Sequence, residues 1–564
     1  MVKRIISLLN KEFGGLHGAA FLLAASSLAS QILALLRDRL LAGNLGPSHE
    51  LDIYYAAFRV PDLLFATVGS FLSITVIIPV LISKLNVSTN ETVGKENVSH
   101  FLGDMFSVFL SGMIFVGGLL FVLAPYFARI IIPGFDDESV ARFIVATRIL
   151  LLSPLFFGIS SLLSGVTQSF KRFLVYALCP VLYNLGIILG VLIFYPIWGL
   201  NGLAYGVVLG AMMHLAVQIP TVLSVGVVPI ISKKINWADV RYVVSRSLPR
   251  TLALGSAQIA TMALVSLASL MASGSISIFN LSYNLQSIPL ALIGISYSVA
   301  ALPSMTDMFS RGKMNEFVDC VETAIRHIIF WSLPATALFI VLRAQIVRTV
   351  LGSGVFNWTN TRLTAAALAV FSVSILAQGL VNFLSMVYYS AGKTTRPVVT
   401  RIFSSVVVIV LAFGFSGFFV KVAGLRNFAE SILRIEGVEG SSLLVLPLAF
   451  TIGSVLNALW LLYDFVRDFG WFSRGLVKSS LQSLLAAIMA GVASYQFLGF
   501  FASVTRIDTF WAVFAQGFFA GVFGLLVAVL VLGAFHNKEL WTIVEVFKEK
   551  FWKSDTIVPT PEEL

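Results

Sequence analysis

Apolar windows of about 20 residues, nearly free of charge, recur along almost the whole chain. A helix needs about 20 mostly apolar residues to cross a bilayer. These windows are long runs rather than short alternating segments, so they predict helices and not barrel strands. We therefore expect an all-α polytopic membrane protein with about fourteen transmembrane helices. The predicted spans are 18–42, 53–82, 103–132, 140–167, 173–196, 201–223, 247–273, 277–305, 318–342, 362–391, 398–423, 441–466, 476–500 and 508–534.

The composition excludes several other classes of protein. Hydrophobic residues make up 58% of the chain and charged residues 12%, whereas soluble domains carry about 25% charged residues. A soluble globular protein, a disordered chain and a nucleic-acid binder are therefore excluded. Two cysteines and six scattered histidines predict no disulfide framework, no metal site and no cofactor.

Basic residues predict the orientation of the spans. With the N-terminus inside, cytoplasmic segments carry 25 Lys and Arg and outside loops carry 11. Cytoplasmic loops are enriched in Lys and Arg, so we expect both termini in the cytoplasm. The net charge of +10 then marks cytoplasmic loops that face anionic lipid.

Paired prolines predict an internal repeat. Pro61 and Pro79 lie in the second span, and Pro289 and Pro303 lie in the eighth, with Gly and Ser between the members of each pair. Pro61 and Pro289 are 228 residues apart, and Lys171 and Lys393, in basic turns, are 222 apart. Kinked helices are tolerated where they line a cavity, so these prolines are candidate hinges; simple packing kinks are the alternative.

The repeat predicts the organisation of the chain. Both halves contain six spans, so they insert the same way round and their pseudo-symmetry axis runs along the membrane normal. The predicted parts are an amphipathic N-terminal segment at 1–17, an N-lobe at 18–223, a cytoplasmic interfacial linker at 224–246, a C-lobe at 247–466, helices 13 and 14 at 476–534, and a cytoplasmic tail at 535–564.

Charged residues are concentrated at the end of the first span and in the second. They are Arg37, Asp38, Arg39, Asp52, Arg59 and Asp62, with Tyr55 among them. Asp52 and Arg59 are two helical turns apart and share a face. Each charge at the bilayer centre costs about 2.5–3.5 kcal/mol, so we expect these charged residues to have a specific structural or functional role. Either Arg37 and Arg39 snorkel to the interface beside Asp38, or Arg37 and Arg59 bind phosphate oxygens in a cavity.

The second half is predicted to contribute neutral polar groups. The seventh and eleventh spans hold no Asp or Glu, so a cation site built on buried carboxylates is not predicted there. Asn284 and Gln286 of the eighth span are the candidate substrate-binding groups of this half.

One run of residues resembles a known family. It contains Arg37-Asp38, then Asp52, Phe58-Arg59, Pro61-Asp62 and later Ile78-Pro79. This run is similar to the start of the MurJ/MviN lipid II flippases, of the multidrug/oligosaccharidyl-lipid/polysaccharide exporter superfamily. The predicted helix count fits that family as well. At positions where the family carries further arginines, this chain has Gln31, Phe65 and Ala66, and Asn284.

The resemblance implies a transporter rather than an enzyme. It implies alternating access between two lobes and movement of lipid II, an undecaprenyl-pyrophosphate-linked glycopeptide, across a bacterial cytoplasmic membrane. Arg37, Asp52 and Arg59 match substrate-site positions of the family, and the lipid tail is expected in a groove at helices 13 and 14. The expected partners are the lipid-linked glycan and membrane lipids, with a cell-wall synthesis complex as a candidate.

Three alternatives remain open. The first is a related exporter of another polyprenyl-linked oligosaccharide or of an amphipathic drug. The second is a membrane enzyme acting on polyprenyl phosphates. Its carboxylates would come from Asp136, Asp137 and Glu138, which are expected to lack a basic or His partner close by and are typical of a solvated loop. The third is a structural component of a division complex.

Overall fold

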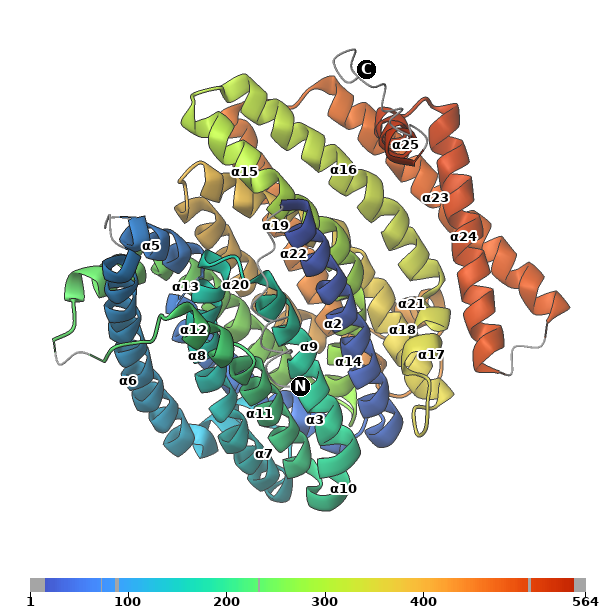
Figure 1. Cartoon of the computed structure of the whole chain (residues 1–564). Coiled ribbons are helices and arrows are strands. Elements are labelled where there is room, and N and C mark those ends of the chain that lie inside the picture. Colours follow the sequence, from blue (N-terminus) through green and yellow to red (C-terminus); the bar gives the residue numbers. More distant parts are fainter. Residues whose placement is uncertain (1–15, 73, 87–90, 232–233, 506–508, 552–564) are drawn as a thin grey trace, which may run out of the picture. The chain divides into compact units, whose positions relative to one another are not determined.

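The computed structural model describes residues 16–551, except 73, 87–90, 232–233 and 506–508. The chain, whose helices are labelled in Figure 1, folds into two compact units. The first comprises Met1–Leu285, Val350–Phe371 and Thr394–Asn457, and the second comprises Gln286–Thr349, Ser372–Lys393 and Ala458–Leu564. These units follow spatial proximity, and the sequence division into two repeats stays a prediction. The predicted segment 1–17 lies almost entirely outside the described residues.

The described residues are almost entirely helical and contain no strand, which confirms the all-α membrane class. The first unit holds, in whole or in part, helices α2 (Leu16–Leu45), α3 (His49–Ala57), α4 (Arg59–Thr67), α5 (Ile74–Asn86), α6 (Glu91–Ile131), α7 (Asp137–Leu150), α8 (Leu152–Ser169), α9 (Phe173–Leu189), α10 (Tyr195–Trp198), α11 (Leu200–Ala216), α12 (Ile219–Val225), α13 (Trp237–Ser269), α14 (Ser275–Leu290), α18 (Trp358–Ser372), α20 (Thr395–Lys421), α21 (Ala423–Leu433) and α22 (Val445–Phe469). The second holds the ends of α14, α18 and α22 with α15 (Ser296–Ser310), α16 (Met314–Val341), α17 (Arg343–Leu351, whose last two residues belong to the first unit), α19 (Ser374–Ser390), α23 (Arg474–Val504), α24 (Phe510–Ala534) and α25 (Lys538–Phe551).

Among the described residues, eleven helices are long and apolar enough to cross a membrane. The number is twelve if α18 and α19, which meet at a bend of 44°, form one span. The two remaining predicted spans correspond to α2, which carries three consecutive charged residues near its end, and to the broken helices α3, α4 and α5. The chain is thus a multi-pass membrane protein, and the count of fourteen is consistent with the structure without being confirmed by it.

The second predicted span is interrupted twice. Phe58 separates α3 from α4, and the 3₁₀ turn Gly69–Leu72 follows α4. Pro61 is the third residue of α4, where a missing N–H costs no helical hydrogen bond. Its ring is therefore compatible with a helix that restarts at Arg59.

Close packing of α9 on α11 depends on glycine. A Cβ atom at Gly186 would lie 2.3 Å from Cα of Gly210, and one at Gly206 would lie 2.4 Å from Cα of Gly190. In lipid, helix association relies on such close backbone approach, because apolar side chains gain little by leaving an apolar solvent. The glycines spaced four apart therefore fix the position of α9, and with it Asn184.

The chain between α12 and α13 is held against α6. The N–H of Ile230 donates to the carbonyl of Ser99 at 3.0 Å. A Cβ atom at Gly103 would lie 1.8 Å from the carbonyl oxygen of Ile230, so only glycine permits this approach. The N–H of Asn236 donates to Asp104 at 3.1 Å, and the Asn236 side chain caps α13.

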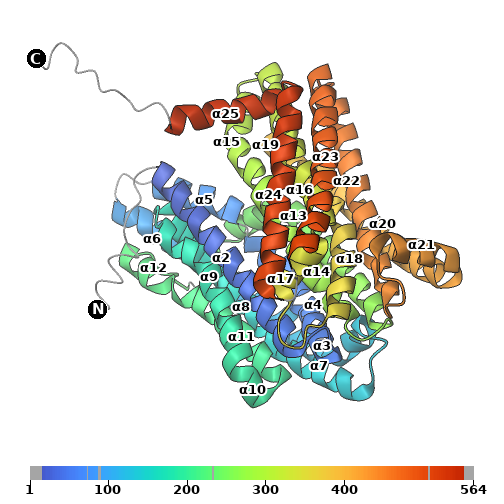
Figure 2. The same ribbon diagram turned by 90° about the vertical axis from the view of Figure 1, so that its right-hand side faces the viewer.

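In the second unit, α23 and α24 lie side by side, and α25 runs across the direction of α24 (Figure 2). A buried ionic network joins α16, α23 and α25. Glu322 accepts hydrogen bonds from the N–H and the hydroxyl of Ser473, while Arg326 lies 3.6 Å from Glu322 and 3.7 Å from Glu539. Ser479 donates to Glu539 at 2.8 Å. Part of the predicted tail is therefore an ordered helix.

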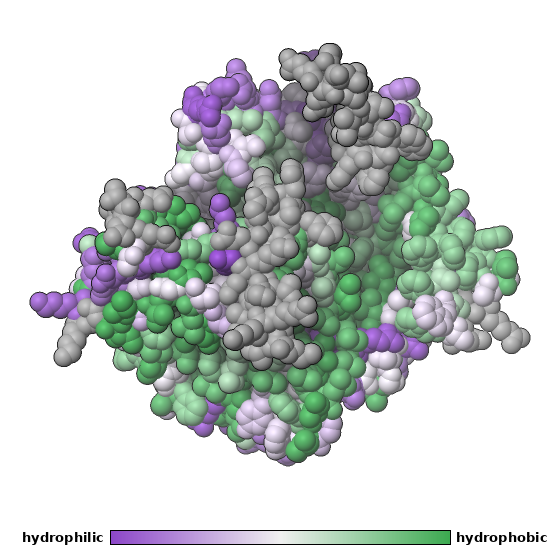
Figure 3. Space-filling model, in the orientation of Figure 1, coloured by the Kyte–Doolittle hydropathy of each residue, from purple (hydrophilic) through white to green (hydrophobic). Residues whose placement is uncertain are grey.

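Apolar side chains cover much of the surface of the long helices, as the space-filling view shows for α24 (Figure 3). Trp511, Phe518 and Leu530 of α24 are exposed. Such a surface is expected where a helix faces lipid rather than water.

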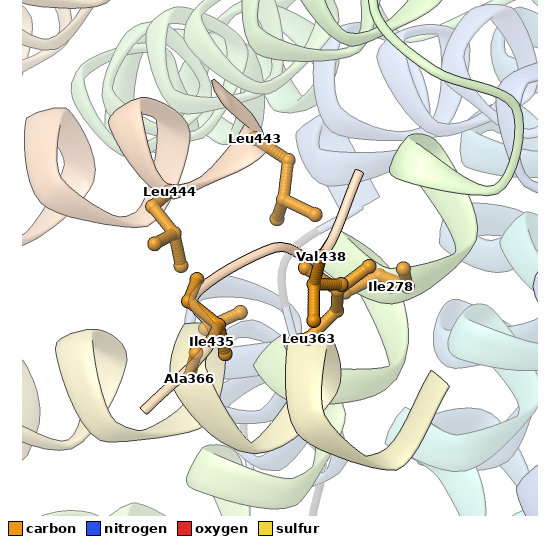
Figure 4. Close-up of a cluster of buried hydrophobic side chains, with 8 residues drawn as sticks. Ile278, Leu363, Ala366, Ile435, Val438, Leu443 and Leu444 are labelled. Atoms are coloured by element: carbon orange, nitrogen blue, oxygen red, sulfur yellow. The ribbon is translucent and has the colours of Figure 1, made fainter. Parts of the chain in front are cut away.

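Buried apolar residues also hold the connection between α21 and α22 (Figure 4). Ile435 and Val438 of this connection pack with Leu443, and with Leu363 of α18. The loop is therefore fixed in the first unit by a small apolar core.

Candidate functional site

Arg37, which is partly exposed, and Asp38, which is buried, form a pair in the second half of α2. Two nitrogens of Arg37, Nε and Nη2, contact Oδ1 of Asp38 at 2.9 and 2.8 Å. Nη1 of Arg37 donates to Oδ1 of Asn184 on α9 at 3.1 Å. Oδ2 of Asp38 accepts from Asn284 on α14 at 3.0 Å. The pair thus links three helices of the first unit.

Arg39 faces away from this pair, because residues two apart on a helix point in nearly opposite directions. Its guanidinium donates to the carbonyls of Val350 at 3.2 Å and Gly352 at 3.5 Å, at the end of α17. A cation at a helix C-terminus offsets the negative end of the helix dipole. Arg39 therefore has a structural partner in each of these carbonyls.

Asp52 accepts hydrogen bonds at the start of α14. The N–H of Gly274 donates to Oδ2 at 2.7 Å, and the N–H of Ser277 donates to Oδ1 at 2.7 Å. The Ser277 hydroxyl donates to Oδ1 as well, at 2.5 Å. The first N–H groups of a helix have no partner within it, and a carboxylate there is favoured by the helix dipole. Asp52 therefore caps α14 from another helix.

Arg59 lies at the helix break and also faces α14. Its Nη2 donates to Oδ1 of Asn280 at 2.8 Å, and its Nε donates to the carbonyl of Tyr55 at 3.3 Å. A guanidinium has five N–H donors. Within the described part of the chain, these two hydrogen bonds use two of the five donors of Arg59. The buried hydroxyl of Tyr55 has no hydrogen-bond partner among the described residues.

One face of α14 collects these contacts, because Ser277, Asn280 and Asn284 are three and four residues apart. The structure thus brings together four of the predicted substrate-binding residues: Arg37, Asp52, Arg59 and Asn284. Gln286 lies two residues beyond Asn284, belongs to the second unit, and accepts from Gln378 at 3.1 Å. It is not part of this cluster. The substrate-binding role of all five residues stays a prediction.

Sequence reasoning did not list Asp38, Asn184, Asn280 and Ser277 as site residues, although each contacts one that it did. Asn280 could have been predicted together with Asn284, since two amides one turn apart in an apolar helix share a face. Asn184 carried a weaker signal, as a lone amide within the fifth span.

The four candidate hinge prolines occupy different kinds of site. Pro61 follows the break at Phe58, and Pro289 precedes the π-helical turn Ala291–Ile295 by two residues. Pro79 and Pro303 lie inside α5 and α15. π-Helical turns frequently occur at functional sites. The first proline of each pair thus lies near an irregular turn, and the hinge role stays a prediction.

A family model described as lipid II flippase MurJ matches residues 41–515. The chain belongs to this family. It is 27% identical over 402 residues to a probable lipid II flippase MurJ from Bdellovibrio bacteriovorus, covering 70% of this chain and 75% of that one. It is 26% identical over 506 residues to one from Vibrio cholerae, covering 85% and 94%.

Two solved structures share the fold of this chain. A lipid II flippase MurJ in an inward closed conformation matches with a TM-score of 0.71 and 19% identity, covering 92% of this chain and 99% of that one. An inward-facing multidrug resistance MATE family transporter of the MOP superfamily matches with a TM-score of 0.62 and 16% identity, covering 78% and 94%.

Proposed function

We propose that the protein is a lipid II flippase, which moves the pyrophosphate-linked headgroup of lipid II across the cytoplasmic membrane of a bacterium. The observation that carries this proposal is the family match, which extends over most of the chain. The transport step breaks and forms no covalent bond, so the protein acts as a transporter and not as an enzyme.

Arg37 and Arg59 are the proposed phosphate-binding groups. Guanidinium groups bind phosphate oxygens in a bidentate geometry. Two partners of these arginines are neutral amides, Asn184 and Asn280, which add no negative charge of their own. Asp38 forms a salt bridge with Arg37, whereas Arg59 interacts electrostatically with Asp62 but forms no salt bridge among the described residues, so Arg59 is the stronger candidate for the pyrophosphate.

Asp52 and Asn284 are proposed to keep these groups in place rather than to bind phosphate directly. Both carboxylate oxygens of Asp52 are occupied by α14, and a carboxylate repels an anion. Asn284 orients Asp38, and through it Arg37. The irregular turns Gly69–Leu72 and Ala291–Ile295 are proposed as the points that bend during alternating access.

Both termini are proposed to lie in the cytoplasm, as the excess of basic residues there predicts. Cysteines can be introduced at Lys313, in the turn between α15 and α16, and at Glu436, in the loop after α21, once the native Cys179 and Cys320 are replaced by serine. An impermeant thiol reagent added to intact cells should label position 436 and not 313. The reverse pattern contradicts this orientation. Association with a cell-wall synthesis complex is a further prediction.

The function is tested by depleting the protein in its own cells and identifying the lipid-linked precursor that accumulates in the inner leaflet. Lipid II should accumulate, and the wild-type gene should relieve this. The Arg59→Ala variant, present at normal membrane levels, should not relieve the accumulation of lipid II. Accumulation of a different polyprenyl-linked glycan would assign the protein to another exporter of the superfamily.

A further inference from the structure

Four ring-bearing side chains from four helices of the first unit form a cluster around Phe157. They are Phe65 of α4, Phe157 of α8, Tyr183 of α9 and His214 of α11, and we refer to them as the ring cluster. The centroid of Phe157 lies 6.0 Å from that of Phe65, 4.9 Å from that of Tyr183 and 5.2 Å from that of His214. All three pairs are edge-to-face, a favoured geometry for aromatic rings.

The neighbours of the ring cluster are polar. Nδ1 of His214 lies 2.6 Å from the hydroxyl of Ser160, and Gln218 bonds to both residues. Tyr183 precedes Asn184, the partner of Arg37, and interacts electrostatically with Arg37. Polar and ionisable groups within spans face the interior of a bundle or a water-filled space rather than lipid. The ring cluster therefore differs from the lipid-facing aromatic residues of α24.

The rings of the cluster are not sealed in a core. Phe65 is 37% exposed, and the other three rings are partly exposed. Phe65 lies over Gly69, where a Cβ atom would come within 2.5 Å of the ring, so the backbone at the 3₁₀ turn supports one side of it. The cluster thus presents aromatic surface next to the proposed phosphate-binding residue Arg37.

We propose that the ring cluster is the surface on which the sugar rings of the lipid-linked substrate stack. The C–H-rich face of a pyranose packs on the electron-rich face of an aromatic ring, which also supplies a large apolar area. In the substrate the first sugar is bonded directly to the pyrophosphate, so a guanidinium and an adjacent aromatic surface match the order of the headgroup. Phe65 stands where the family resemblance leads one to expect an arginine, so this chain has aromatic surface there in place of a cation.

This inference rests on the proposed function, and two ligands separate the two claims. Binding of lipid II and of undecaprenyl pyrophosphate, which has the same phosphates and tail but no sugar, is measured on the purified full-length protein in nanodiscs. Phe65→Leu and Phe157→Leu should each weaken lipid II binding about 3- to 10-fold and leave undecaprenyl pyrophosphate binding unchanged. Phe65→Tyr, which keeps the ring, should bind lipid II as the wild type does.

Phe115→Leu is the matched control, because Phe115 is 75% exposed on the apolar surface of α6; it should change neither affinity. Phe65→Leu at the more exposed position keeps the test valid if Phe157→Leu fails to fold. Equal weakening for both ligands, or no weakening for either, overturns the sugar-stacking role while leaving the flippase proposal intact. If the wild-type protein binds neither ligand, the proposed function itself fails.

Discussion

Replacing Asp52 with asparagine separates a structural from a substrate-binding role of this residue. The carboxylate is 2% exposed and accepts three hydrogen bonds from Gly274 and Ser277. Asparagine has nearly the same shape but offers one acceptor oxygen, and its NH₂ group would face an N–H donor. The substitution therefore weakens the cap of α14 while leaving the packing volume nearly unchanged.

The expected cost follows from these contacts. Hydrogen bonds to a charged group contribute about 1.5–3 kcal/mol each, and a carboxylate at a helix N-terminus adds up to about 2 kcal/mol in a partly buried site. Because asparagine keeps one acceptor, we expect Asp52→Asn to lower the free energy of unfolding by about 3 kcal/mol. Ser277→Ala, which removes only the hydroxyl donor, should cost about 1 kcal/mol.

The assay is unfolding of the purified variants in mixed micelles, combined with measurement of lipid II affinity. Asp137→Asn serves as the control; its side chain is 86% exposed in a surface pair with Arg129, and it should change stability by less than about 0.5 kcal/mol. The double variant Asp52→Asn/Ser277→Ala should be less destabilised than the sum of the two single variants, because both act on one contact. A stable Asp52→Asn variant that no longer binds lipid II would refute the capping account and place Asp52 in contact with the substrate.

Three further predictions follow from the packing and the charges. Arg59→Ala should weaken lipid II binding about 10- to 150-fold, and Arg59→Lys should weaken it measurably because lysine cannot bind in a bidentate way. The control is Arg311→Ala, which removes an exposed pair with Asp307 and should bind lipid II as the wild type does. Unchanged binding by Arg59→Ala would contradict the phosphate contact. Gly206→Val should lower thermal stability or membrane levels sharply because α9 and α11 would be forced apart, and normal stability of this variant would show that the close approach is dispensable. Glu322→Ala should destabilise the protein by about 3–5 kcal/mol, measured by unfolding in micelles, because it leaves Arg326 short of a buried partner; a loss below about 1 kcal/mol would mean that the network is not needed.

The membrane class could be predicted from the sequence because the bilayer imposes a local rule. Every spanning helix must supply about 20 apolar residues and satisfy its own backbone. Breaks within the second span were harder to locate. The presence of Pro61 indicated an irregularity, but α4 starts at Arg59 and accommodates the proline in its first turn, while the second break is a 3₁₀ turn at Gly69–Leu72.

The candidate site was predicted in part. The shared face of Asp52 and Arg59 could be predicted because they are seven residues apart, two helical turns. Both residues face α14 in the structure. Their partners could not be predicted, because the pairing of Asp52 with Ser277 joins residues 225 apart in the chain. The sequence prediction places Gln286 in the same site as Asn284, but side chains two positions apart on a helix are separated by roughly 200° and point to different sides.

The central claim is that the protein moves lipid II across a bilayer through Arg37 and Arg59. It is tested most directly by reconstituting the purified protein in proteoliposomes with fluorescent lipid II and following the outer-leaflet fraction with an impermeant quencher. The wild-type protein should raise the rate at which inner-leaflet lipid II becomes accessible well above that of protein-free vesicles, and the double variant Arg37→Ala/Arg59→Ala should return it to the protein-free rate. Equal rates for the wild type and the double variant, or no rate above protein-free vesicles for the wild type, would contradict the account.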